Sequence, residues 1–220
     1  MKYIFNDCQL MTLLALGGGN RAFTFRTQDS FTDEEKVSAI NHLYRLGALE
    51  EQNGRMVLAE PFATWIGVLQ KAKRVIAIRR EGTVQSQYLL YPAGDGKVVV
   101  LRSTGDYGNT LKLSCEDGSA FLADLKENEI LPRSLLQERS EAEDLERFAA
   151  EELNAPEGDL QLRVSVSNAV SGAVEKTCEI VDTPALQLMR VSAADGSYTH
   201  LYAAKELSDL LEELLKGEES

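Results

Sequence analysis

The chain has 220 residues, of which 44% are hydrophobic and 26% charged, and its formal net charge at pH 7 is −12. This length and apolar content suffice for a buried core without disulfides or structural metals. The acidic balance argues against nucleic acid or an anionic membrane as a partner, because both would be repelled.

The first elements predicted are a short strand over Lys2–Asn6 and a helix over Gln9–Leu16, which ends at Gly17–Gly19. The apolar run in this helix is preceded by Asn6 and Asp7 rather than by the basic start of a signal peptide, and it is too short to span a membrane. We therefore expect a cytoplasmic protein. The cysteines agree with a reducing compartment, because Cys8, Cys115 and Cys178 are distant from one another and lack metal-ligand spacing.

A helix, a hairpin and a second helix are predicted over residues 31–72. Thr32–Glu35 forms a capping box, and Gly47 ends the helix that it begins. Asn53-Gly54 predicts a two-residue type I′ hairpin turn, and a helix with one apolar face follows Pro61. This order is winged-helix-like. The apolar residues that recur at helical spacing in the first helix are Val37, Ile40, Leu43, Tyr44 and Leu46.

Two sets of four short strands, each followed by a helix, make up most of the remaining chain. The first set comprises strands at Arg74–Arg80, Gln87–Tyr91, Val98–Arg102 and Thr110–Cys115, with a helix through Phe121–Leu125. The second comprises strands at Leu160–Ser167, Thr177–Val181, Leu186–Val191 and Tyr198–Ala203, with a helix through Leu207–Leu215. A capping box at Ser140–Glu143 predicts a further helix between the two sets.

The repeated order predicts an α+β fold with pseudo-two-fold, duplicated antiparallel sheet halves and helices packed on the sheet. We expect a single domain over residues 1–220, with repeat halves 1–125 and 126–220. The halves should share one sheet, because an isolated four-stranded half would leave an unpaired edge.

No catalytic pattern is apparent. His42 and His200 fall in unrelated elements, with no acidic residue or nucleophile placed to complete a triad. The acidic pairs lie at helix starts or on helix faces, where solvation explains them. The densest basic stretch, Lys71–Arg80, is interpreted as a helix C-terminus complemented by cations. We therefore expect a protein that is not an enzyme and that needs neither cofactor nor metal.

Several segments resemble the EspG family of type VII (ESX) secretion. The resemblance spans residues 31–125 and 160–215 and is carried by Thr32–Glu35, Leu46–Leu49, Asn53–Arg55, the apolar helix ending near Val68-Leu69, and Val181–Pro184. EspG proteins are cytosolic chaperones that bind the helical tip of a secreted PE–PPE heterodimer and keep it soluble. At Ala185–Gln187 the sequence departs from the Gly-Arg turn expected of the family.

The resemblance implies a helical secreted protein as the partner, either PE–PPE-like or another small helical protein. It also implies partner contacts in a loop of the first sheet half, Arg80–Ser86, and in the helix that begins at Lys205. The partner-binding residues predicted on this basis are Arg79, Arg80, Glu81, Gln85, Lys205, Asp209 and Glu212.

The alternative function is that of a winged-helix-type transcriptional regulator with a sensory C-terminal part. Residues 31–72 motivate it, but DNA-reading helices present basic residues to the duplex. The helix after the hairpin carries only Lys71 and Lys73, at its end.

Overall fold

The computed structural model describes residues 2–19, 21–22, 25–26, 31–81, 86–104, 110–133, 158–184 and 186–216. The helices in these ranges are α1 (Asp7–Leu16), α2 (Asp33–Arg45), α3 (Phe62–Lys71), α4 (Gly118–Glu127) and α6 (Ala204–Lys216). None of them combines the length and the hydropathy that a membrane span requires.

A nine-stranded antiparallel sheet forms the centre of the fold, in the order β1-β9-β8-β7-β6-β10-β11-β12-β13. Its strands are β1 (Lys2–Asn6), β6 (Arg74–Arg80), β7 (Ser86–Gly94), β8 (Lys97–Thr104), β9 (Thr110–Asp117), β10 (Asp159–Asn168), β11 (Val174–Asp182), β12 (Gln187–Ala193) and β13 (Gly196–Leu201). Two hairpins stand outside it, β2 (Arg21–Ala22) with β3 (Phe25–Arg26) and β4 (Leu49–Gln52) with β5 (Arg55–Leu58). The predicted α+β class is confirmed.

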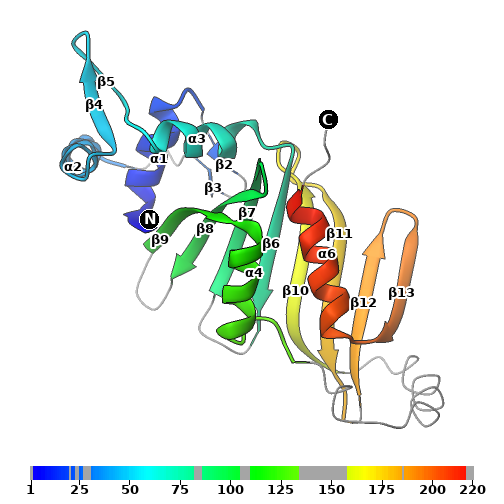
Figure 1. Ribbon diagram of the computed structural model, residues 1–220. Helices are drawn as coiled ribbons and strands as arrows, with labels where there is room; N and C mark the ends of the chain where they lie inside the picture. The colour runs from blue at the N-terminus through cyan, green and yellow to red at the C-terminus, as the bar shows by residue number, and fades with distance from the viewer. Residues whose placement is uncertain are drawn as a thin grey trace.

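The two predicted sets of strands lie in this one sheet. Strands β6 to β9 precede α4, strands β10 to β13 precede α6, and the sets meet where β6 pairs with β10, from Arg80 opposite Leu162 to Arg74 opposite Asn168. Figure 1 shows α4 and α6 beside each other on the same face of the sheet. The duplication of the halves and their boundary at residue 125 stay predictions.

Each face of the sheet has its own hydrophobic core because side chains alternate along the strands. In β6, Ile76 and Ile78 pack with α4 and α6, whereas Val75 and Ala77 pack with α1 and α3. The core under α1 and α3 extends from β1 to β6. The core under α4 and α6 extends from β8 to β12 and therefore spans the junction of the two sets.

The local signals in the N-terminal third are confirmed. Thr32 begins α2 with the predicted capping box. Asn6 begins α1 with a second capping box that was not predicted, so α1 starts at Asp7 and not at Gln9. Asn53 and Gly54 both have positive φ, as a type I′ turn requires. The order helix, hairpin, helix is also present, but its identity as a winged helix stays a prediction.

The apolar residues of α2 do not form one buried stripe. The structure buries Leu43 completely, whereas Val37 is 57% exposed, Tyr44 55% and Leu46 37%. The reason is the position of α2, which contacts α1 and β4 instead of lying on the large sheet. Figure 1 shows it beyond the β1 edge of the sheet, next to the β4–β5 hairpin.

Some predicted boundaries change. Strand β13 ends at Leu201, so Tyr202 and Ala203 belong to the connection before α6. The ring of Tyr202 is completely buried there, and its hydroxyl donates a hydrogen bond to the carbonyl oxygen of Pro132 at 2.7 Å. The predicted capped helix at Ser140–Glu143 lies outside the described residues.

Tyr91 provides a test of the core under α3. Its side chain is completely buried, and its hydroxyl has no hydrogen-bond partner in the described part of the chain. We expect Tyr91→Phe to raise the free energy of unfolding by about 1–2 kcal/mol, because an unsatisfied buried hydroxyl is removed. Tyr202→Phe is the matched control and should lower it by about 1 kcal/mol, because a satisfied bond is lost. Urea unfolding of both variants measures the two changes in the free energy of unfolding. Changes of the same sign would contradict the view that the Tyr91 hydroxyl is unsatisfied and the Tyr202 hydroxyl is satisfied.

The buried thiol of Cys178 should make the free energy of unfolding depend on pH. Burial raises the pKa of its thiol to about 12. Between about pH 9 and pH 12 the thiol ionises in the unfolded chain but stays protonated in the folded one, so the unfolded state binds fewer protons. The free energy of unfolding should therefore fall by about 1.4 kcal/mol per pH unit from this group. Cys178→Ala should show a correspondingly shallower loss over the same range in urea unfolding; an identical slope would refute the role of the thiol.

Candidate functional site

The partner residues predicted in the first sheet half lie at the end of β6. Arg79 follows the alternation of Val75 and Ala77 and lies on the face of α1 and α3, where its Nε is 3.0 Å from Glu81 Oε1. The backbone amide of Glu81 donates to the carbonyl oxygen of Gln161, so this residue extends the pairing of β6 with β10. Arg80 falls on the opposite face, with Ile76 and Ile78. Gln85 lies outside the described residues.

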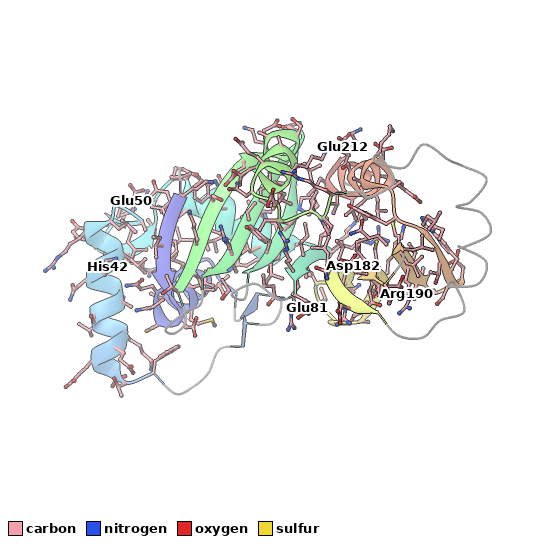
Figure 2. All side chains as sticks on the ribbon, turned by 90° about the horizontal axis from the view of Figure 1, so that it is seen from below. His42, Glu50, Glu81, Asp182, Arg190 and Glu212 are labelled. Atoms are coloured by element: carbon pink, nitrogen blue, oxygen red, sulfur yellow. The ribbon has the colours of Figure 1, made fainter. Side chains whose placement is uncertain are left out.

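The partner residues predicted in α6 form an exposed stripe. Lys205, Asp209 and Glu212 are exposed, and Lys205 Nζ lies 2.5 Å from Asp209 Oδ2. The opposite side of α6 buries Leu207 and Leu211 against the sheet. In Figure 2, Glu212 and Glu81 are on opposite sides of the sheet. The structure therefore does not bring Arg79 and Glu81 together with the α6 stripe into one surface.

A row of charged residues crosses the sheet on the face of Arg79. Arg79 lies opposite Arg163, Arg163 opposite Glu179, and Glu179 opposite Arg190. The Arg163 guanidinium contacts Glu179 Oε1 at 2.8 Å through Nε and at 2.7 Å through Nη2. The sequence alone does not reveal this row, because its members belong to four strands whose register only the folded sheet fixes.

His200 has an acidic neighbour that sequence reasoning missed. Its Nε2 lies 2.9 Å from Glu206 Oε2, because the connection after β13 turns the start of α6 back toward the strand. The nearby thiol of Cys178 is not a suitable nucleophile, since burial keeps it protonated. Within the described ranges no group of three His, Cys, Asp or Glu side chains is arranged to hold a metal ion.

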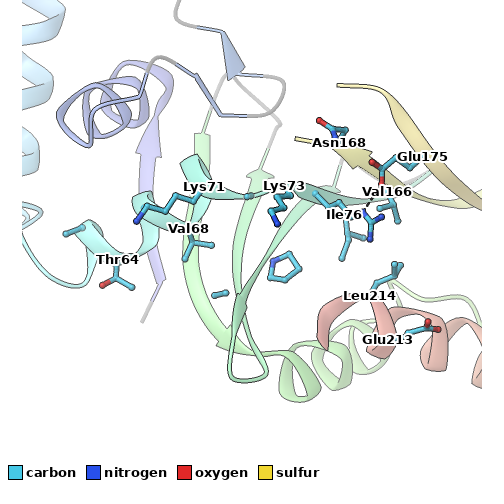
Figure 3. A pocket seen from close by; sticks show the side chains of 16 residues that line it. Thr64, Val68, Lys71, Lys73, Ile76, Val166, Asn168, Glu175, Glu213 and Leu214 are labelled. Atoms are coloured by element: carbon cyan, nitrogen blue, oxygen red, sulfur yellow. Dashed lines mark hydrogen bonds and ion pairs between the residues drawn. The ribbon is translucent and has the colours of Figure 1, made fainter. Parts of the chain in front are cut away.

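A groove of about 990 Å³ opens on the surface of the described residues. It lies between α3 and the C-terminal part of α6 and crosses the adjoining ends of β6, β7, β10 and β11. In Figure 3, Lys71 and Val68 lie on the α3 side, and Glu213 and Leu214 lie on the α6 side.

The α3 wall of the groove consists mostly of small side chains, with Lys71 at its end. Phe62, Trp65, Ile66 and Leu69 bury the other side of the helix. The side that remains faces the groove with Ala63, Thr64, Gly67, Val68 and Lys71. A Cβ atom placed on Gly67 would meet nothing within 4 Å, so this wall is open. A second helix can approach such a wall closely, since interhelical distance depends on side-chain size.

The floor of the groove is apolar and its rim is charged. Ile76, Val166 and Pro92 contribute to the floor. Arg74 at the rim pairs with Glu175, with 2.8 Å between Nε and Oε2.

Two cations at the rim are unpaired. Lys71 and Lys73 are both exposed and form no ion pair with any residue that the structure describes. Glu213, which also lines the groove, has no ion-pair partner within the described ranges. The charged residues lining the groove are Lys71, Lys73, Arg74, Glu175 and Glu213, so the groove is locally positive on a protein of net charge −12. The sequence interpretation of this basic stretch as a helix end holds for Lys71, which lies in the last turn of α3. It missed that the same residues border a groove, because α6 is distant in sequence.

No protein-family model and no curated protein matches the sequence.

Proposed function

We propose that this chain is a non-catalytic cytosolic binding protein of the EspG chaperone type, which holds a helical segment of a protein secreted by a type VII system. The observation that supports the proposal is the groove between α3 and α6, with its small-residue wall, apolar floor and charged rim. Amphipathic helices bind other proteins by laying their apolar face into such grooves.

The charges at the rim define the partner segment further. Lys71 and Lys73 stand beside the apolar floor without an ion-pair partner among the described residues. A helix with carboxylates flanking its apolar stripe would pair with them, whereas a basic amphipathic helix would be repelled. Complementary charge of this kind selects between partners and speeds association more than it adds affinity.

The EspG resemblance implies partner contacts at Arg79, Glu81 and the α6 stripe, and these contacts are separate from the groove. Because the sheet separates them, one short helix cannot cover both. A partner that uses both regions would have to pass around the edge of the sheet or contribute two segments.

The alternative, a winged-helix-type transcriptional regulator, keeps the support of the helix, hairpin, helix order. The charge of the surface disfavours it, because α2 and the β4–β5 hairpin present more carboxylates than cations to a duplex. The carboxylates are Asp33, Glu34, Glu35, Glu50 and Glu51, and the cations are Lys36, Arg45 and Arg55.

Filling the groove should abolish capture of the partner. Gly67→Leu adds a side chain to the open wall of α3 and should stabilise the helix, since glycine is a poor helix former. We expect the variant, co-expressed with helical secretion substrates encoded in its own genome, to lose at least about tenfold in affinity. Co-purification and isothermal titration calorimetry measure the loss.

Ala123→Leu on the exposed side of α4 is the matched control and should capture the substrates normally. The double variant Lys71→Glu, Lys73→Glu should bind acidic helices more weakly and basic helices more tightly than the parent chain. Equal capture of the substrates by Gly67→Leu and by the parent chain would exclude the groove as their binding site. Salt-sensitive binding of a DNA duplex, with no substrate captured, would favour the regulator.

A further inference from the structure

The outer side of α2 is an exposed surface that the proposed function does not use. Glu34, Ser38, Asn41 and Arg45 are exposed along it, and they border a shallow hollow of about 460 Å³ together with Val37 and His42. In Figure 2, α2 stands at one end of the molecule and carries the exposed His42. Figure 1 shows α2 at the opposite side of α1 from the sheet half that carries α6.

The order of charges along this surface is self-complementary. Glu34 lies in the first turn of α2 and Arg45 in the last, and neither forms an ion pair with a described residue. The midpoint between them falls between Ser38 and Asn41. When a second α2 is laid antiparallel about this midpoint, Glu34 of each copy meets Arg45 of the other. Ser38 of each copy then meets Asn41 of the other, which can exchange hydrogen bonds.

The exposed apolar residues Val37 and Tyr44 are also compatible with a two-fold axis between the two helices. Val37 and Tyr44 are seven residues apart and share one flank of the helix. In the antiparallel pair, a two-fold axis places both flanks on the same side. Tyr44 of one copy then lies within about 3 Å, along the helix axis, of Val37 of the other. The pairing covers two side chains that are 57% and 55% exposed in the single chain.

We propose that two copies of this chain associate through α2, as an antiparallel helix pair around a two-fold axis. In such an isologous interface the same patch serves both partners, so the patch must be complementary to itself. The α2 surface meets this condition in its charges, its central polar residues and its apolar flank. The helix-binding groove between α3 and α6 is not part of the pair, so the dimer would hold two grooves.

The size of the interface sets the expected affinity. A pair of single helices buries less than the roughly 1,600 Å² typical of stable complexes. We therefore expect a dissociation constant in the micromolar range, on the order of 10–100 µM.

A charge exchange between two variants tests the pairing. Glu34→Arg leaves only arginines at the two ends of the interface, and Arg45→Glu leaves only glutamates. Each variant alone should therefore dimerise at least about tenfold more weakly than the parent chain. An equimolar mixture should form a heterodimer, because an arginine of the first variant then meets a glutamate of the second at both ends. Sedimentation velocity at concentrations up to about 300 µM, spanning the expected micromolar range, measures the parent chain, each variant and the mixture.

Glu51→Arg on the exposed β4 strand is the control, because it makes the same change of charge outside the interface and should leave dimerisation unaltered. Thermal unfolding of every variant establishes that the fold is intact. A parent chain that stays monomeric at the highest concentration would overturn the proposal. So would a parent dimer that neither single variant weakens, or a mixture of the two variants that stays monomeric.

Discussion

The pairing of β6 with β10 is the contact on which the rest of this structure depends. It joins the two sets of strands into one sheet, and its register places Ile76 and Ile78 on the same face as Val164 and Val166. That face can then carry α4 and α6 over one continuous core. A slip of one residue would exchange the two faces of a strand. It would turn Arg163 into the core, so the apolar pattern of both strands enforces the observed register.

The junction of β6 with β10 also explains why the two faces of the sheet differ from each other. The core under α1 and α3 reaches β6 and there gives way to charged residues, including the pair Arg163–Glu179. Helix α6 covers the other face, and the groove lies between α3 on one face and the C-terminal part of α6 on the other, across the adjoining ends of β6, β7, β10 and β11. The positive rim of the groove arises because the last turn of α3 and the start of β6 are joined by only two residues, Ala72 and Lys73. The groove therefore lies where elements of both sets of strands meet.

Helix α2 stands apart from this arrangement. It is attached through Leu43 and Ala39 to α1 and β4, and most of its circumference remains exposed. A helix in this position contributes little to the main core, so its outer residues are free to serve contacts with other molecules. Their order along the helix is the self-complementary pattern on which the proposed α2 dimer rests.

Local chemistry along the chain predicted much of the described secondary structure. The Thr32–Glu35 capping box and the Asn53-Gly54 turn act through residues close in sequence, and the helix and the hairpin that they predict are present. The β2–β3 hairpin was not predicted. Contacts between distant residues were not readable, because sheet register and helix placement fix them. Only the tertiary structure brought Glu206 to His200 and Lys73 to the groove edge, and only it separated Arg79 from the outer stripe of α6. The sequence carries the pattern that makes a face apolar or polar, but packing decides which element that face meets.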